Sequence, residues 1–559
     1  MKMFEKNTPV EEADQDAPRP YKAEILAELI DLDRDVMKLL VRRAKLLNRL
    51  RGGKDHAATP AAARAEKDVR TAWEKNATAF SRDEKFARQL FSLLQEVRVE
   101  SHVDASARSG FNLAPSRRPV TVNLPGPGSV TATRLLAVLA SWFGNSLTLE
   151  NILLNDPLMS TVKALNSAGA GFTWTVSARA GEGTLRHTPS GSGVFLARDK
   201  ALYIGEDILG MYLMAFLAAS QTGKARFTGG SGLKMADLSP LRRFLPTLGA
   251  RLAHSVPKSN GLPGSVEASG QLPDYIVVPH ELCREGLIAL FCAVAAWRKK
   301  VSIDCAALPL PLFTATLAEC LPVLRACSVT DSLNGTVVVL DATDANVSEH
   351  VACPLDPLLS AYLLALPGFA GGTVALAGKW DAGLPFATSA QELLQQNGLA
   401  VQADAQGVRS AVDASGSVVA QPLDLSQVED GLIPLGLAFA ARQTWKQKAE
   451  TLLPLLPEAI DMDIVEGFYA HVGLACRDGK IMPGAPRDGK SSWTSPSPEW
   501  SFAYALCSYD ASNIQLTNPF VVTGLMPSFW ALFNALPDPS EVKAVPEKEE
   551  KTHRRIRTR

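Results

Sequence analysis

Several features are missing from this chain, and each absence excludes a class of protein. No apolar run reaches the roughly 18 residues that a membrane-spanning helix needs, and the first twenty residues are too polar for a secretory signal. The formal net charge is -1, from 57 basic and 58 acidic residues among 559. This balance produces no field that would attract nucleic acid or an anionic membrane, so we expect a cytoplasmic protein without either partner.

Metal-binding and disulfide patterns are missing as well. The eight cysteines are scattered without C-x-x-C spacing, and the eight histidines are equally dispersed. Most cysteines occur in apolar stretches, such as FCAVAAW around Cys292, which is typical of buried reduced thiols. We therefore predict no zinc site, and no metal or organic cofactor is implied.

What the chain does have is a recurring order of elements. Six times an apolar, helix-like run leads into a short β-rich stretch and then into a second helix-like run that ends near a small residue. The clearest copy has LLSAYLLALPGF at 358–369, TVALA at 373–377 and ATSAQELLQQNG at 387–398. A spacing of roughly 55 to 90 residues suits a βαβ-type unit, so the pattern predicts an α/β protein made of globular lobes. The six runs start at these residues: Leu135, Ile208, Leu287, Leu358, Leu432 and Trp500.

The first hundred residues have a different pattern. Residues 1–20 are acidic and interrupted by proline, and we predict that they are disordered, whereas 21–104 has the apolar spacing of three helices. Three helices of unequal length bury little surface alone, so we expect this module to form a homodimer or to dock on the rest of the chain. A linker is predicted at 105–118, the repeat region at 119–537 and a charged tail at 538–559. Within the repeat region, the Pro- and Ser-rich segment 483–500 is predicted to be a flexible loop.

The repeat region resembles the 5-enolpyruvylshikimate-3-phosphate (EPSP) synthases. VNLPGPGSVTATRLLAVLA at 122–140 is similar to the family's opening pattern, which is close to LPGSKSxSNR, and similar segments follow in order as far as LTNPFVVTGLMPSFWALF at 516–533. The resemblance implies two lobes, each of three βαβαββ units, that close on substrate at chain crossings near residues 126 and 356. It also implies transfer of the carboxyvinyl group of phosphoenolpyruvate to shikimate-3-phosphate or a related cyclic alcohol, in the pathway to chorismate and the aromatic amino acids.

The helices before the linker resemble the all-helical chorismate mutases of the AroQ type. The matching residues are LIDLDRDVMKLLVRRAKLL at 29–47, with Lys54 after them. Members of that family surround a dicarboxylate with arginines, a lysine and a glutamine. Arg43 and Lys54 match this pattern, and Arg64 matches it after a small register shift, but the first-helix arginine position is Leu26.

Many cations of the EPSP synthase pattern are replaced here. Charge-assisted hydrogen bonds are worth about 1.5 to 3 kcal/mol each, so their loss would weaken the binding of two phosphates. The resemblance therefore implies that the acceptor, or the way its phosphate is held, has changed. The replacements are Gly128 for a lysine, Tyr212 and Gly232 for arginines, and Cys283-Arg284-Glu285 for a Ser-Ser-Gln triplet.

Two acidic residues keep their places in the pattern. Asp430 stands where the family's proton-shuttling aspartate does, and Asp356 stands at the second crossing, so both are candidate catalytic residues. Each also has a simpler explanation, because Asp356 before Pro357 is typical of a helix N-cap and Asp430 would favour the start of an apolar helix through the helix dipole. The candidate substrate-binding residues are Ser129, Arg134, Lys234, Arg284 and Glu285.

These residues also allow simpler interpretations, and three functions stay open. Ser129 fits an ordinary turn as well as an anion cradle, and Arg284 with Glu285 fits an exposed charge pair. The first hypothesis is a divergent enolpyruvyl transferase. The second is a non-catalytic metabolite-binding or scaffold protein of the same pathway, and the third is chorismate mutase activity from the N-terminal module only.

Overall fold

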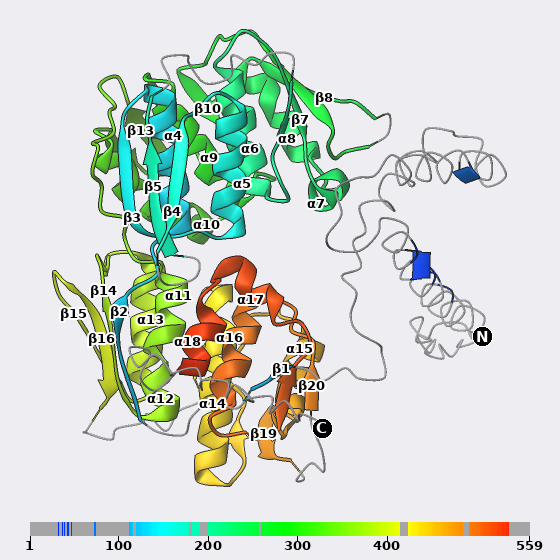
Figure 1. Cartoon of the computed structure of the whole chain (residues 1–559), viewed down its shortest axis with the longest axis vertical. Helices are drawn as coiled ribbons and strands as arrows, with labels where there is room; N and C mark the ends of the chain where they lie inside the picture. The colour runs from blue at the N-terminus through cyan, green and yellow to red at the C-terminus, as the bar shows by residue number, and fades with distance from the viewer. Residues whose placement is uncertain are drawn as a thin grey trace, which may run out of the picture. The chain divides into compact units, whose positions relative to one another are not determined.

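The computed structural model (Figure 1) divides the chain into two compact units, residues 1–108 and 109–559, which are described separately. In the first unit the described residues are helical, and the predicted disordered segment 1–20 lies outside them, as does most of the three-helix module. The charged tail at 538–559 lies outside them too. The described residues are 32, 36, 39, 42, 43, 46, 72, 73, 111–113, 115, 119–177, 182–189, 200–256, 259–413, 423–484, 491–511 and 513–535.

The second unit is a mixed α/β structure. Its helices are α4 (Val130–Phe143), α5 (Asp156–Ser167), α6 (Ile208–Ala219), α7 (Ser231–Met235), α8 (Ser239–Phe244), α9 (Arg284–Ala296), α10 (Leu310–Ala326), α11 (Pro357–Leu364), α12 (Leu366–Ala370), α13 (Pro385–Gln396), α14 (Ile433–Gln447), α15 (Met462–His471), α16 (Pro498–Cys507), α17 (Phe520–Leu525) and α18 (Phe529–Ala535), with 3-10 turns η1 (Leu245–Leu248) and η2 (Asp430–Leu432). Its strands are β1 (Phe111–Asn112), β2 (Val120–Pro125), β3 (Leu147–Leu153), β4 (Phe172–Val176), β5 (Glu182–His187), β6 (Ala201–Tyr203), β7 (Gly223–Thr228), β8 (Ala250–His254), β9 (Gly264–Ala268), β10 (Tyr275–Val277), β11 (Lys300–Asp304), β12 (Thr330–Asn334), β13 (Val337–Asp341), β14 (Gly372–Ala377), β15 (Leu399–Ala403), β16 (Gly407–Val412), β17 (Thr451–Leu452), β18 (Leu474–Arg477), β19 (Lys480–Pro483), β20 (Ser491–Trp493) and β21 (Ile514–Leu516).

Across the described ranges the strands form six small sheets. Three of them have four strands, in the orders β6-β7-β9-β8, β10-β11-β13-β12 and β2-β14-β16-β15. In each, the first two strands are parallel and the other pairings are antiparallel, so one strand arrangement occurs three times. The other sheets have the orders β3-β5-β4, β17-β19-β18 and β1-β21-β20.

Two separate hydrophobic cores divide the unit into two lobes. The core of the first lobe runs from Ala132 to Val347, and the core of the second contains β2 together with residues from Leu355 to Phe533. The chain therefore passes into the first lobe after Leu124 and returns before Leu355. In Figure 1 the first lobe is cyan to green and the second is mainly yellow to red.

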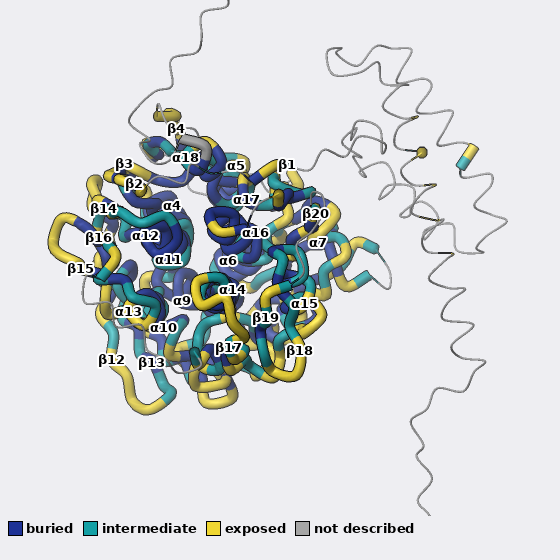
Figure 2. Tube along the Cα trace, turned by 90° about the horizontal axis from the view of Figure 1, so that it is seen from below, coloured by how far each residue is buried: buried dark blue, intermediate teal, exposed yellow. Residues whose placement is uncertain are grey.

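Buried helices occupy the middle of each lobe. In the first lobe α6 and α9 are apolar around their whole circumference, as expected of helices that other elements of the lobe surround. α11 and α16 have the same character in the second lobe, and Figure 2 shows these helices as dark blue tube inside more exposed strands. All six predicted helical runs are helices: α4, α6, α9, α11, α14 and α16.

Backbone hydrogen bonds join the two crossings. Gly128 and Leu355 form an antiparallel bridge, and Asp356 N donates to Pro127 O over 2.7 Å. Gly126 N donates to Ala377 O over 2.8 Å at the end of β14. A Cβ atom on Gly126 would lie 2.6 Å from a methyl carbon of Leu355, so a side chain here would require the Leu355 side chain to move.

Two segments differ from the sequence-based expectation. The predicted loop at 483–500 contains β20, which pairs in parallel with β21, and its last residues begin α16 at Pro498. The prediction of a loop was therefore wrong for 491–493 and 498–500. Proline at 498 does not prevent a helix, because the first turn of a helix does not need the N–H that proline lacks. Part of the predicted linker is the strand β1, which pairs with β21.

No helix in the parts of the chain that the structure describes is long and apolar enough to cross a membrane.

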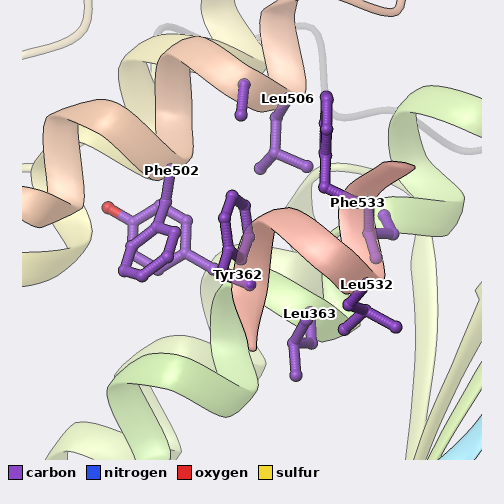
Figure 3. Close-up of a pocket in the computed structure, with 9 residues that line it drawn as sticks. Tyr362, Leu363, Phe502, Leu506, Leu532 and Phe533 are labelled. Atoms are coloured by element: carbon purple, nitrogen blue, oxygen red, sulfur yellow. The ribbon is translucent and has the colours of Figure 1, made fainter. Parts of the chain in front are cut away.

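The core of the second lobe contains a small apolar cavity of about 10 Å³, shown in Figure 3, between α11, α16 and α18. Its lining is hydrocarbon apart from the Tyr362 hydroxyl, and the volume barely admits one water molecule. The cavity is a packing defect of the core and provides no ligand site.

Phe502 should be a main contributor to the stability of the second lobe. It is 1% exposed, and the centre of its ring lies 5.2 Å from the centre of the Tyr362 ring and 4.6 Å from the centre of the Phe529 ring. We expect Phe502→Ala to lower the free energy of unfolding by about 3 to 5 kcal/mol in urea titrations, because it enlarges an existing cavity. Leu333→Ala, at a residue that is 56% exposed, is the control and should change it by less than about 0.5 kcal/mol.

Candidate functional site

Asp356 lies where the chain enters the second lobe. It is the N-cap of α11, and its Oδ1 accepts a hydrogen bond of 3.0 Å from the backbone N–H of Leu359. Burial raises the pKa of its carboxyl group to about 6, against the opposing effect of the Leu359 N–H. The negative charge of Glu319 raises this pKa further, and the positive charge of Arg284 lowers it. Asp356 can therefore change protonation near neutral pH.

Arg284 and Glu319 belong to the first lobe. Arg284 is the first residue of α9, and its Nη2 forms an ion pair with Oε2 of Glu319 on α10. Both side chains act electrostatically on Asp356 of the second lobe. We call Arg284, Glu319 and Asp356 the interlobe charge cluster. Sequence reasoning identified Arg284 and Asp356 but missed Glu319, which lies in the middle of an ordinary helical pattern.

A groove lies beside the crossings. It has a volume of about 460 Å³, and its lining contains the side chains of Glu150, His350 and Lys379 and the thiol of Cys353. We call it the hinge groove, because β3 of the first lobe and the end of β14 in the second both line it. Lys379 and His350 supply basic groups that no family motif indicated. The full lining is Gly126, Gly128, Thr148, Glu150, Asn151, His350, Val351, Ala352, Cys353, Leu355, Ala377, Gly378 and Lys379.

Two of the predicted substrate-binding residues serve the interior of the first lobe. Arg134 is only 3% exposed; its Nε donates to Thr161 Oγ1 over 2.8 Å, and its Nη2 forms an ion pair with Asp207. Ser129 is the N-cap of α4, with its hydroxyl accepting from Ala132 N over 3.2 Å. In this structure both side chains are therefore bound within the protein.

A carboxylate of the chain itself fills a glycine-rich turn in the first lobe. Glu206 Oε2 accepts a hydrogen bond of 2.5 Å from the backbone N–H of Gly232. A Cβ atom on Gly230 would lie 1.6 Å from Glu206 Oε1, so the glycine allows the carboxylate to approach. Lys234 follows on α7 and is half-buried.

Glu285 lies apart from the Arg284 ion pair. It is half-buried in the first turn of α9, beside Cys283 and Tyr212. Burial is the main cause that raises the pKa of both the Tyr212 hydroxyl and the Cys283 thiol, and the charge of Glu285 adds to each effect. The Tyr212 hydroxyl and the Cys283 thiol are therefore neutral at physiological pH.

Asp430 is exposed at the start of η2, just before α14. No hydrogen bond or ion pair joins its side chain to any residue that the structure describes, and the neighbouring Gly431 lies against Leu358 at the start of α11. The backbone next to it is fixed, because the Tyr362 hydroxyl donates to Gly431 O over 2.9 Å.

The candidate mutase residues can be followed only in part. Arg43 is helical and half-buried, with its guanidinium carbon 5.7 Å from the centre of the Trp73 ring. Lys54 and Arg64 lie outside the described residues. Among the residues with described positions, no group of three or more His, Cys, Asp or Glu side chains could hold a metal ion.

Comparison with known proteins shows the fold. No protein-family profile and no curated protein sequence matches the chain. EPSP synthase from Acinetobacter baumannii matches with a TM-score of 0.60 and 17% identity, over 76% of this chain and 98% of that one. The enolpyruvyl transferase NikO from Streptomyces tendae matches with a TM-score of 0.54 and 12% identity, over 75% and 96% of the two chains. The two-lobed unit, with its interlobe charge cluster and hinge groove, therefore has an EPSP-synthase-like fold.

Proposed function

We propose that the two-lobed unit is a divergent enolpyruvyl transferase. It moves the carboxyvinyl group of phosphoenolpyruvate to a hydroxyl of shikimate-3-phosphate or a related cyclic alcohol. The observation that carries the proposal is Asp356, a carboxyl group with a pKa of about 6 at the boundary between the two lobes. A group with this pKa can both donate and accept a proton at physiological pH.

The proposed chemistry needs such a group twice. The acceptor oxygen loses its proton and bonds to C2 of phosphoenolpyruvate, while the methylene carbon gains a proton, which gives a tetrahedral intermediate. Loss of a proton from the resulting methyl group and of inorganic phosphate then restores the double bond. Asp356 is the proposed proton carrier, and exposed Asp430 is proposed as a second one. Arg284, Lys234 and Lys379 are the proposed cations for the phosphate and the carboxylate of the donor.

The chain's own carboxylates favour an acceptor with less negative charge than shikimate-3-phosphate. Asp207 neutralises Arg134, and Glu206 occupies the N–H group of Gly232. A phosphate at either place would meet an existing carboxylate and would be repelled. We therefore favour a related cyclic alcohol without a phosphate group, such as shikimate itself, over shikimate-3-phosphate.

The same carboxylates support a second candidate, a metabolite-binding protein without turnover. If Arg134 and the glycine turn are permanently bound within the protein, the first lobe keeps its shape and loses two means of stabilising a transition state. This alternative predicts that a ring-shaped ligand stabilises the fold although no phosphate is released.

Several finer assignments stay predictions. The shikimate or chorismate pathway and the six βαβαββ repeats rest on the sequence resemblance, and the strand order shared by three sheets supports the repeats. The cytoplasmic location rests on the composition of the sequence. A homodimer through the N-terminal helices is supported by exposed apolar residues at helical spacing. Chorismate mutase activity of that module is tested by measuring chorismate consumption by the full chain and by its Arg43→Ala variant. The exposed apolar residues are Leu32, Val36, Leu39 and Leu46.

Asp356→Asn should separate the two candidate functions. Asparagine can still cap α11, so the fold should survive, but it cannot carry a proton. We expect phosphate release from phosphoenolpyruvate with shikimate or shikimate-3-phosphate to fall by about 10²- to 10⁴-fold. The control is Asp461→Asn, which alters the N-cap of α15 and should leave the rate unchanged. If neither acceptor reacts with the unaltered protein but one of them raises its Tm, binding without turnover is the better description.

The raised pKa of Asp356 also predicts a pH dependence of stability. Aspartate in an unfolded chain has a pKa of about 3.9, whereas the pKa of folded Asp356 is about 6. At pH values between these two, Asp356 is therefore protonated more often in the folded protein than in the unfolded chain. The stability that protonated Asp356 contributes should therefore be lost as pH rises through this range. We expect the Tm of the unaltered protein, relative to that of Asp356→Asn, to fall between about pH 4 and pH 6. A constant difference across this range would contradict the raised pKa.

A further inference from the structure

We propose that Asn155 is an interlobe latch, a side chain whose hydrogen bond holds the two lobes together. Its amide group caps α5 in the first lobe and at the same time binds the last carbonyl group of α17 in the second. The bond lies outside the crossing segments, so it restricts rotation of the lobes about them. This inference does not rest on the proposed function, and it can be tested without any substrate.

Asn155 uses both polar atoms of its amide group. Its Oδ1 accepts a hydrogen bond of 3.1 Å from Leu158 N, and its Nδ2 donates to Leu525 O over 3.0 Å. Leu158 belongs to the core of the first lobe, whereas Leu525 packs against the core of the second. Leu525 is the last residue of α17, where backbone carbonyl groups have no partner within the helix. One side chain therefore satisfies an unpaired N–H group of one lobe and an unpaired carbonyl group of the other.

The surroundings of Asn155 are closed to water. The residue is only 1% exposed, so Nδ2 has no solvent partner that could replace Leu525 O while the lobes stay together. A buried amide N–H without a partner is costly, which makes this bond more important than one at the surface. The hydrogen bond therefore depends on the lobes being in contact, and their contact is stabilised by it.

Two further contacts lie beside the latch. Leu153 is 3% exposed and belongs to the core of the second lobe, although its strand β3 pairs with β5 of the first. A Cβ atom on Gly524 would lie 3.4 Å from Asp156 Oδ2, so the backbone of α17 lies directly against the first turn of α5. Separation of the lobes at this place would expose Leu153 and break the Asn155 bond together.

The crossings alone would allow the lobes to move. Two adjacent chain segments joined by backbone hydrogen bonds form a hinge, and a hinge is fixed only by contacts elsewhere. The structure provides such contacts between α5 and α17 and between α10 and α13. Figure 1 shows α17 at the end of the second lobe that faces the first. The latch is the contact of this kind that depends on a specific side-chain amide.

Asn155→Asp and Asn155→Ser separate the latch from the helix cap. Aspartate and serine cap helices about as well as asparagine does, so α5 should keep its first turn. An ionised aspartate cannot donate to Leu525 O, and it places a negative charge against that oxygen; serine is too short to reach it. We expect the population with separated lobes to rise by about two- to tenfold in Asn155→Ser, and by more in Asn155→Asp.

The measurement is the distance between two spin labels, one on each lobe of the full chain, by pulsed electron paramagnetic resonance. The labels are attached to non-natural amino acids at Tyr275 and Leu452, which are 53% and 55% exposed, because the chain has eight cysteines of its own. The unaltered protein should give one main distance. Both Asn155 variants should add a second one.

Asn166→Asp is the matched control on the same helix. Asn166 Nδ2 donates to Phe172 O over 2.9 Å, and Oδ1 accepts from Phe172 N over 2.8 Å, so the same kind of bond is lost within the first lobe alone. This variant should lower the Tm and leave the distance distribution unchanged. An unchanged distribution in Asn155→Asp overturns the proposal, and so does an equal change in Asn166→Asp, which would indicate general loosening of α5. If Asn155→Asp does not fold, Asn155→Ser decides by the same criterion.

Discussion

The architecture depends on the backbone pairing of the two chain crossings. Ser129 N donates to Pro354 O and Asp356 N donates to Pro127 O, so each crossing segment is held by the other. A central helix of one lobe starts directly after each segment, with Ser129 capping α4 and Asp356 capping α11. The same few hydrogen bonds therefore set where both helices begin, and Leu355 packs against Gly126 in the space that a side chain would occupy. A substitution here would affect both lobes at once.

A second constraint is that the chain's own carboxylates pair with its cations, in the interior at Arg134 and near the surface at Arg284. Arg134 pairs with Asp207 and Arg284 pairs with Glu319, while Glu206 takes the backbone N–H of Gly232. Carboxylates of the chain therefore occupy positions where a ligand anion could have been held. A buried or half-buried ion pair of this kind fixes geometry more than it adds stability.

The sequence predicted what depends on local pattern. Apolar runs located all six central helices, and Asp356 before Pro357 correctly indicated an N-cap. Pairings between residues distant in the sequence could not be predicted: Arg134 and Asp207 are 73 residues apart, and Arg284 and Glu319 are 35 apart. The basic residues of the hinge groove, Lys379 and His350, gave no signal because they belong to no motif and meet only through folding. The segment 491–493 was misjudged because a strand of three residues is too short for its alternation to be recognised.

The chemistry of Asp356 bears on whether the fold is used for catalysis. A helix N-cap needs only one hydrogen-bond acceptor, and asparagine or serine would cap α11 about as well without a charge to bury. Aspartate at this place is less stable when ionised, since burial and Glu319 both oppose the negative charge. A scaffold would gain stability at neutral pH by replacing it. Proton transfer, in contrast, requires a carboxyl group poised near its pKa, and the aspartate at this cap meets that requirement where a purely structural residue would not.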